Sequence, residues 1–376
     1  MTLYADDVLQ DNETAGRVDI WLWLLPLILS GLGILMVTST TSNFVYDVSG
    51  TPFTMGMRQL RSLGVGFVMM LVTFCIPMRF WYNISGAFWI ASIIMLAATL
   101  IPGVGSSIGG ASRWIRVGGI SIQPSEIMIL ATVLESGKLF EKHRLDSLKC
   151  FRLIIILLIV SCLPLMLQPD LGSTIFLVMV CMGMFVERFG LTYPAMAVMF
   201  CGVGFLLLIL FEPYRMRRIS AFLDPYADPL DTGFQTIQGL IAFANGGAWG
   251  AGLGHGFQKL QYLPAAYTDF IYAAMGEELG LIGTLSVLAL MTFWLFRCRA
   301  LYNRVPDGYQ AALVWGVALT IILPFFINIA GVTNMIPLTG IPLPFISYGG
   351  SALIMSWMRV GVLLRLQKDI SRGVAV

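Results

Sequence analysis

The chain has 376 residues, of which 57% are hydrophobic and 12% are charged, and its formal net charge is only +2. Because soluble domains carry about 25% charged residues, this composition excludes an ordinary soluble domain and predicts a polytopic membrane protein. The small net charge does not favour a nucleic-acid partner. The six cysteines lack CxxC or zinc-ligand spacing and the two histidines lie far apart, so the sequence indicates no metal site.

Ten apolar stretches approach the roughly 20 residues that a membrane-spanning helix needs. They cover residues 21–40, 62–78, 84–103, 122–140, 152–168, 172–187, 191–211, 269–295, 310–332 and 345–366. The sequence therefore predicts an all-α integral membrane protein with about ten transmembrane helices and a large extracytoplasmic loop before the eighth. An even number of spans places both termini on one side of the membrane.

The chain divides into a polytopic membrane domain, residues 19–368, and two tails, residues 1–18 and 369–376. Lys and Arg are enriched in cytoplasmic loops. The loops that we therefore assign to the cytoplasm carry Arg79, Lys138, Lys142, Arg144, Lys149, Arg152, Arg188, Arg297, Arg299 and Arg304. Both tails are then predicted to be cytoplasmic, and residues 212–268 are predicted to form the large extracytoplasmic loop.

The first polar motifs of the extracytoplasmic side surround the start of the fourth predicted helix. The segment GGASRWIRVGGISIQPSE, residues 109–126, contains Trp114 and ends with Glu126, shortly after Pro124. This proline marks a helix start, where a carboxylate either complements the helix dipole or lines a site. Asp170, in QPDLGS, either caps the next helix or lines the same site, and the two roles are compatible.

The predicted large loop carries a cationic patch and a run of glycines. Arg215, Arg217 and Arg218 either anchor lipid headgroups or capture an anionic group such as a pyrophosphate, for which the guanidinium fork is well shaped. The glycines of residues 246–256 lack the GK[ST] ending of a phosphate-binding loop, so nucleotide binding is not indicated. The large apolar side chains of the loop predict that it is ordered and partly embedded.

One carboxylate, Asp269 in PAAYTDF, stands where an apolar helix begins. A charge at this boundary is costly to desolvate and is usually kept for a function, so Asp269 is either the N-cap of that helix or a general base. Glu277 follows about 12 Å further along the helix, and it and Glu278 are expected deep in the bilayer, facing a cavity or paired. The proline- and glycine-rich residues 331–352 predict a rigid lid or wall over the cavity.

In their order and spacing, these motifs resemble the SEDS family (shape, elongation, division and sporulation), which polymerises peptidoglycan. The motifs are LGILMV (32–37), RWIRVGGISIQPSE, QPDLGS, FLDP, the glycine run, LPAAYTDFIYA, GEELG and PLTGIPLPFISYGGSAL, and they cover nearly all of the transmembrane part. The segment QKLQYLP is more similar to the division branch, FtsW, than to the elongation branch, RodA.

The resemblance implies ten spans and a glycosyltransferase that polymerises lipid II into β-1,4-linked glycan at the outer face of the bacterial cytoplasmic membrane. Asp269 matches the family's essential aspartate, which would deprotonate the GlcNAc 4-hydroxyl of an incoming lipid II. That oxygen attacks the anomeric carbon of the MurNAc at the lipid-linked end of the growing chain, and undecaprenyl pyrophosphate leaves. The candidate substrate-binding residues are Trp114, Glu126, Asp170, Arg215, Arg217 and Lys259.

The same resemblance implies partners and a place in the cell. The partners are lipid II, undecaprenyl-pyrophosphate-linked glycan, a class B penicillin-binding protein whose transpeptidase cross-links the glycan, and other divisome membrane proteins. The place is the division septum. No cofactor is evident, and residue spacing leaves open whether a divalent cation binds near the pyrophosphate.

Three positions depart from the family pattern. Ala265 and Tyr267 stand where the family usually has Glu and His, and Ile129 stands where it usually has a Lys that pairs with Glu126. Either another cation replaces that Lys, or Glu126 is protonated, or catalysis is weakened. Two other functions therefore stay open: a lipid II flippase, for which the acids of GEELG would line the path, and a non-catalytic division scaffold.

Overall fold

Nine of the ten predicted spans form long helices in the computed structural model. It describes residues 19–374 except 50, 102, 104, 109–110, 118–119, 198–215, 217–219, 221, 232, 258–262 and 306–307. The helices are α2 (Trp21–Ser49), α3 (Thr54–Cys75), α4 (Met78–Thr99), α5 (Pro124–Lys142), α6 (Ser147–Leu167), α7 (Leu171–Phe189), α11 (Ile271–Tyr302), α12 (Tyr309–Val332) and α13 (Gly350–Ser371). The tenth predicted span, residues 191–211, lies mostly outside the described residues.

Six of these nine helices are long and apolar enough to cross a membrane, namely α2, α4, α6, α7, α11 and α12. The other three are α3, which has two arginines near its start, and α5 and α13, which carry several charged side chains. Contacts with other helices shield part of each from lipid, since α3 packs along α13 and α5 packs against α4 and α12. The predicted helical membrane fold is confirmed.

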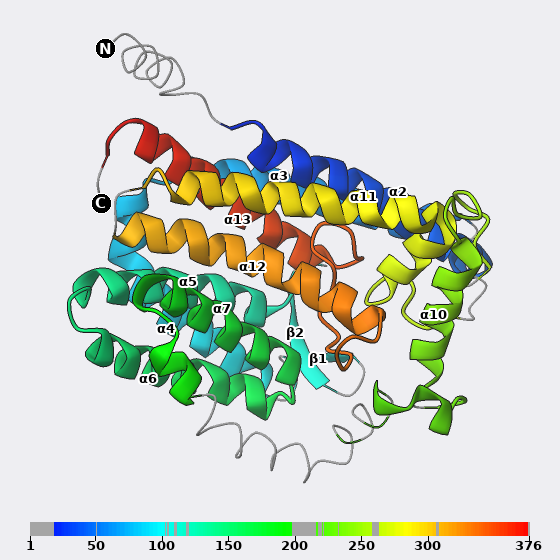
Figure 1. The fold of residues 1–376 in the computed structure, drawn as a ribbon, viewed down its shortest axis with the longest axis horizontal. Helices are drawn as coiled ribbons and strands as arrows, with labels where there is room; N and C mark the ends of the chain where they lie inside the picture. The colour runs from blue at the N-terminus through cyan, green and yellow to red at the C-terminus, as the bar shows by residue number, and fades with distance from the viewer. Residues whose placement is uncertain are drawn as a thin grey trace.

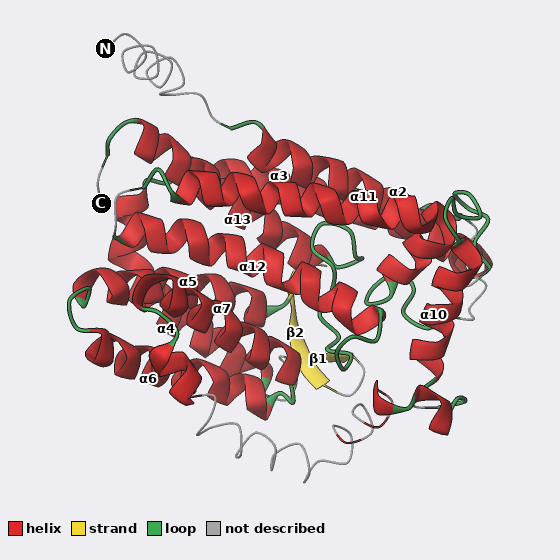
Figure 2. Ribbon diagram, in the orientation of Figure 1, coloured by secondary structure: helices red, strands yellow, loops and turns green. Residues whose placement is uncertain are grey.

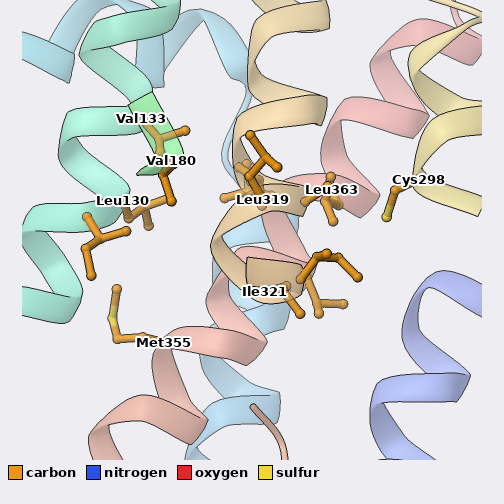
Figure 3. Packing of buried hydrophobic residues seen from close by; sticks show 14 of the residues in the cluster. Leu130, Val133, Val180, Cys298, Leu319, Ile321, Met355 and Leu363 are labelled. Carbon is orange, nitrogen blue, oxygen red and sulfur yellow. The ribbon is translucent and has the colours of Figure 1, made fainter. Parts of the chain in front are cut away.

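Helix α12 is the centre of the bundle. Figure 1 shows it between α11 and α13 on one side and α4 to α7 on the other. Within its most apolar stretch 67% is buried, the highest share among the six apolar helices. Figure 3 shows Leu319 and Ile321 of α12 packed among core residues that include Leu130 of α5, Val180 of α7 and Leu363 of α13. A helix that is apolar all round is typical of such a central position.

The close approach of α12 and α7 depends on two glycines. A Cβ at Gly316 of α12 would lie 2.6 Å from Met184, and one at Gly183 of α7 would lie 2.8 Å from Leu319. Each helix thus receives a large side chain where it carries none itself. Small residues at such crossings are the usual way in which membrane helices pack closely.

The described chain begins and ends at the same end of the bundle, which we call the terminal end (Figure 1). Asp19 pairs with Arg297 of α11 at 2.6 Å, and the carbonyl of Val374 accepts a hydrogen bond from Gln310 of α12 at 2.9 Å. These contacts place the two described ends, residues 19 and 374, at the same end of the bundle. The assignment of that side to the cytoplasm stays a prediction.

The opposite end, which we call the sheet end, carries a small antiparallel sheet that the all-α prediction did not include. Its strands β1 (Gly105–Ile108), β2 (Ala111–Val117) and β3 (Ile120–Ile122) pair in that order. Trp114 of β2 lies opposite Ser106 of β1, and Figure 2 shows the strands among the loops beside the bundle. Because β3 leads directly into α5, the sheet places Trp114 near the start of that helix.

The predicted large loop contains two short helices in its described part. They are η1 (Pro225–Ala227), a 3₁₀ turn, and α10 (Phe234–Gly246), which stands beside the start of α11 (Figure 1). Helix α10 packs against α11 because Gly239 leaves room for the ring of Phe270, which a Cβ there would approach to 2.9 Å. The loop is thus ordered in this part, as predicted.

Candidate active site at the sheet end of the bundle

One connecting segment, residues 333–349 between α12 and α13, joins several elements at the sheet end, and we call it the wall segment. Gln59 of α3 donates from Nε2 to the carbonyl of Ser347 at 3.0 Å. Gly172, in the first turn of α7, lies against the carbonyl of Thr339, which a Cβ would approach to 2.9 Å. The region predicted to be a lid or wall is therefore a packed wall between helix ends.

Asp269 is half-buried and lies in the turn that leads into α11. The carbonyl of Ala265 closes this turn by accepting hydrogen bonds from the backbone N–H groups of Thr268 at 3.0 Å and Phe270 at 3.2 Å. Phe270 is the N-cap residue of α11, and its own side chain makes no capping hydrogen bond. The N-cap alternative for Asp269 is therefore wrong, because the turn places one more residue between this acid and the helix.

The wall segment and α12 hold the backbone of this turn at three successive carbonyls. The backbone N–H of Tyr348 donates to the carbonyl of Tyr267 at 2.9 Å. The hydroxyl of Ser347 donates to the carbonyl of Thr268 at 2.6 Å, and the side-chain amide of Asn328 donates to the carbonyl of Asp269 at 2.9 Å. The rings of Tyr267 and Tyr348 also meet edge to face at 5.9 Å. The main chain that carries Asp269 is thus fixed from outside its own helix.

Asp170 has the helix-capping role that the sequence left open and also makes an ion pair, while its site-lining role stays a prediction. It is the N-cap of α7 and accepts hydrogen bonds from the backbone N–H of Ser173 at 3.3 Å and from its hydroxyl at 2.8 Å. It also pairs with Arg113 of β2 at 3.8 Å, and Arg113 donates to the carbonyl of Pro169 at 2.6 Å. The pair brings the strand that contains Trp114 to the start of α7.

Glu126 has a cationic partner on another helix. Arg359 of α13 bonds to the Glu126 carboxylate at 2.7 Å and to its carbonyl at 3.2 Å, and the arginine is only 3% exposed. Ile129 is packed in the core at 1% exposure. Of the three alternatives raised by Ile129, the geometry therefore supports replacement of the cation. Sequence reasoning missed Arg359 because it lies far along the chain from Glu126.

Glu277 and Glu278 are almost fully buried, at 1% and 2% exposure. Glu278 accepts hydrogen bonds from the hydroxyl of Ser39 in α2 at 2.6 and 2.8 Å and from the backbone N–H of Gly254 at 3.0 Å. Glu277 accepts one from the backbone N–H of Phe257 at 3.0 Å. Of the two alternatives expected for these acids, a cavity or pairing, the contacts favour pairing, because both acids bind the glycine-rich loop and Glu278 also binds α2.

The two acids can bind the glycine-rich loop because α11 breaks at Gly280, whose φ of 69° is not helical. The glycine-rich loop fills the break: the N–H groups of Leu281 and Ile282 donate to the carbonyls of Gly247 and Ala248 at 2.9 and 3.2 Å. Loop N–H groups donate in return to the carbonyls of the two acids at 2.9 and 3.0 Å. The loop thus satisfies backbone groups that a helix break inside a membrane protein would otherwise leave unpaired.

Three candidates stay outside this description. Arg215, Arg217 and Lys259, which were singled out by charge and location, lie outside the described residues. Within the part of the chain that is described, no three His, Cys, Asp or Glu side chains are grouped so that they could hold a metal ion. Among the described residues, the candidate site comprises Asp269 on its fixed turn, the Arg113–Asp170 and Arg359–Glu126 pairs, and Trp114, and their roles in binding and catalysis stay predictions.

The sequence profile of the FtsW/RodA/SpoVE cell cycle proteins matches residues 20–372, which include every candidate site residue. This chain belongs to the FtsW/RodA/SpoVE family. Among its FtsW/RodA/SpoVE relatives, the probable peptidoglycan glycosyltransferase FtsW of Coxiella burnetii is 34% identical over 355 residues, which are 93% of this chain and 95% of the relative.

Another member of the FtsW/RodA/SpoVE family, stage V sporulation protein E of Bacillus subtilis, is 37% identical over 355 residues, which are 93% of this chain and 97% of the relative. A chain of a peptidoglycan synthase complex, solved to show how polymerization and crosslinking are coordinated, is similar in structure, with a TM-score of 0.78. It is 27% identical, and the match covers 94% of this chain and 98% of that one. The family fold thus extends over nearly the whole chain.

Proposed function

We propose that this chain is a peptidoglycan glycosyltransferase that polymerises lipid II at the outer face of the bacterial cytoplasmic membrane, with the sheet end outside. Membership of the FtsW/RodA/SpoVE family and the peptidoglycan glycosyltransferase name of its relatives support the activity. The FtsW name of these relatives supports a role in septal wall synthesis during division.

In the proposed reaction, the Asp269 carboxylate takes the proton of the GlcNAc 4-hydroxyl of an incoming lipid II. The oxygen then attacks the anomeric carbon of the MurNAc at the lipid-linked end of the glycan. The bond from that carbon to the pyrophosphate breaks, undecaprenyl pyrophosphate leaves with the bonding electrons, and the α configuration is inverted to a β-1,4 linkage. A positioned base contributes roughly 10²- to 10⁴-fold to such a step.

The observation that carries this proposal is the setting of Asp269. It is a half-buried carboxylate on a turn whose three successive carbonyls are hydrogen-bonded to the wall segment and α12. A base held in one orientation against a bound hydroxyl turns a bimolecular encounter into an effectively unimolecular step. The fixed turn therefore suits general-base chemistry.

The other candidates have supporting roles in the proposal. Trp114 offers an aromatic surface to a sugar ring, and Glu126 and Asp170 line the same end of the bundle, each paired with an arginine. We propose the cations Arg215, Arg217 and Lys259 as ligands of the departing pyrophosphate on the basis of their charge and place in the sequence. A chelator titration in the polymerisation assay tests whether a divalent cation joins them.

A class B penicillin-binding protein is the proposed partner, together with other divisome membrane proteins. The similarity to a chain of a peptidoglycan synthase complex that coordinates polymerization and crosslinking supports such an assembly. The flippase alternative loses the feature that motivated it, because the two buried acids of α11 bind the glycine-rich loop.

The decisive experiment uses the purified full-length chain and labelled lipid II, with and without the cognate transpeptidase. Glycan polymer that disappears in Asp269→Ala supports the glycosyltransferase. Transfer of lipid II between the leaflets of a liposome without polymer supports the flippase. A chain that does neither, with or without its partner, is a division scaffold.

A further inference from the structure

We infer that Asn328 and Ser347 are positioning residues for the base, an assignment that rests on the proposed function. Both side chains lie outside the turn that contains Asp269, and both donate to its main chain. The sequence pattern did not single out Asn328, and it included Ser347 only as part of the proline- and glycine-rich residues 331–352. Their proposed role is to fix the direction from which the Asp269 carboxylate meets the acceptor hydroxyl.

Asn328 of α12 holds two chain segments with one nitrogen. Its Nδ2 donates to the carbonyl of Asp269 and to the carbonyl of Ile341 in the wall segment, both at 2.9 Å, and the residue is 4% exposed. Because the two carbonyl oxygens need a donor, the amide of Asn328 must point its nitrogen, not its oxygen, toward them. Asn328 therefore ties the turn to the wall segment.

The other amide atom of Asn328 shows that this arrangement has a cost. Its Oδ1 is buried and has no hydrogen-bond partner among the residues that the structure describes. An unsatisfied buried acceptor costs about 1–3 kcal/mol, and native structures keep few of them. An asparagine at this position is therefore not explained by the stability of the core alone, and the two carbonyls that it holds are the feature that uses it.

Ser347 acts on the neighbouring carbonyl. Its hydroxyl donates to the carbonyl of Thr268 at 2.6 Å and accepts from the backbone N–H of Leu343 at 2.8 Å. Gln59 of α3 binds the Ser347 carbonyl in turn. The hydroxyl is thus oriented by its own surroundings, so the turn is connected through Ser347 to α3 and through Asn328 to α12.

Fixing two adjacent carbonyls restricts the backbone dihedrals of Asp269 and leaves its direction to the two side-chain torsions. Displacement of a reacting group by about 1 Å can cost about 10²-fold in rate. Removing either donor should therefore lower the turnover number while leaving substrate binding, which involves the other site residues, nearly unchanged.

The test compares Asn328→Leu and Ser347→Ala with the unmodified full-length chain in initial-rate assays over a range of lipid II concentrations. Leucine is close in size to asparagine and removes the orphaned oxygen together with the donor, so the fold should tolerate it. Thr320→Val is the matched control, since Thr320 is buried in the same helix and its hydroxyl bonds only within that helix.

We expect each of the two variants to lower kcat by about tenfold or more with KM changed less than about threefold. The double variant should lose less than the product of the single losses, because both donors serve one turn. Thr320→Val should keep kcat. Unchanged kcat in both variants, or equal losses in the control, would overturn the positioning role.

A second measurement separates this inference from the proposed function. Amide hydrogen exchange of the peptide covering residues 264–272 should become faster in Asn328→Leu and Ser347→Ala and not in Thr320→Val. If the unmodified chain forms no polymer with its partner present, the proposed function fails and the positioning of a base fails with it, whatever the exchange shows. Polymer formation by the unmodified chain, combined with unchanged exchange and kcat in both variants, rejects the positioning role alone.

Discussion

The turn before α11 and the helix break at Gly280 both lie near acidic side chains, yet the two regions are held together in opposite ways. At the turn, side chains of other elements donate to the backbone carbonyls of Thr268 and Asp269. At the break, the carboxylates of Glu277 and Glu278 themselves accept the anchoring hydrogen bonds. Asp269 is thus held in place by its surroundings, whereas Glu277 and Glu278 hold the glycine-rich loop in place.

The largest expected effect comes from neutralising one acid of each region with its amide. Asp269→Asn should lower polymerisation by roughly 10²- to 10⁴-fold, because an amide cannot take the proton, and it should change thermal unfolding less than the variant of the other region. Glu278→Gln should instead lower the unfolding temperature and leave the folded protein active. Lipid II polymerisation and thermal unfolding in detergent measure both. Equal loss of activity with full stability in the two variants would contradict the distinction.

The second largest effect is expected at the Arg359–Glu126 pair. Arg359→Ala leaves a carboxylate without its cation, and breaking a buried pair in this way costs about 3–5 kcal/mol. Adding Ile129→Lys to this variant places a cation three residues after Glu126 on the same helix face, so stability and activity should return in part. Ile129→Met in the same background is the control and should not rescue.

A smaller effect is expected at the helix break itself. Gly280→Ala forces a side chain onto a backbone with φ 69° and ψ −172°, a region adopted almost only by glycine, which costs about 1–3 kcal/mol, and its Cβ would meet the backbone nitrogen of Gly250. Thermal unfolding should show the loss. Gly64→Ala, where a Cβ meets no atom within 4 Å, is the matched control and should not destabilise. A Gly280→Ala variant as stable as this control would show that the break is dispensable.

The smallest effect concerns the turn that holds Asp269. Ala265 has a φ of 55°, which glycine adopts without strain. Ala265→Gly removes the penalty of the left-handed conformation but adds the larger chain entropy that glycine loses on folding. The unfolding free energy should therefore rise by about 0.5 kcal/mol. Ala266→Gly, a change at a buried neighbour without this φ, should lower it. A loss of polymerisation in Ala265→Gly would show that the strain itself serves catalysis.

Most of the fold could be predicted because each membrane helix corresponds to a long apolar stretch of the sequence. The helices from α2 to α7 and from α11 to α13 match the predicted spans to within several residues at most ends, with α2 the longest extension. The three-stranded sheet was not predicted, because its strands are short and lie in a segment whose charges and glycines are typical of a loop. The break at Gly280 was hidden by apolar residues on both sides.

The candidate site was predictable only where one residue carries its own signal. Asp269 stood out as a charge beside an apolar helix, although the turn at Ala265 made its N-cap role wrong. Arg359 is a charge inside the predicted span 345–366, a signal that the sequence analysis did not use, whereas Asn328 carries none. The partners of both residues lie far away in the chain. Partnerships of this kind follow from how the helices pack, which a single sequence does not state.

The break at Gly280 also decides which part of α11 has to match the bilayer. The part after the glycine, residues 281–302, is about 33 Å long at 1.5 Å per residue, close to the roughly 30 Å of a hydrocarbon core. A thinner or thicker membrane would be accommodated by the tilt of this part. The turn with Asp269 is tied to α12 and the wall segment. It would therefore keep its position relative to the bound sugar of the proposed substrate when the thickness of the membrane changes.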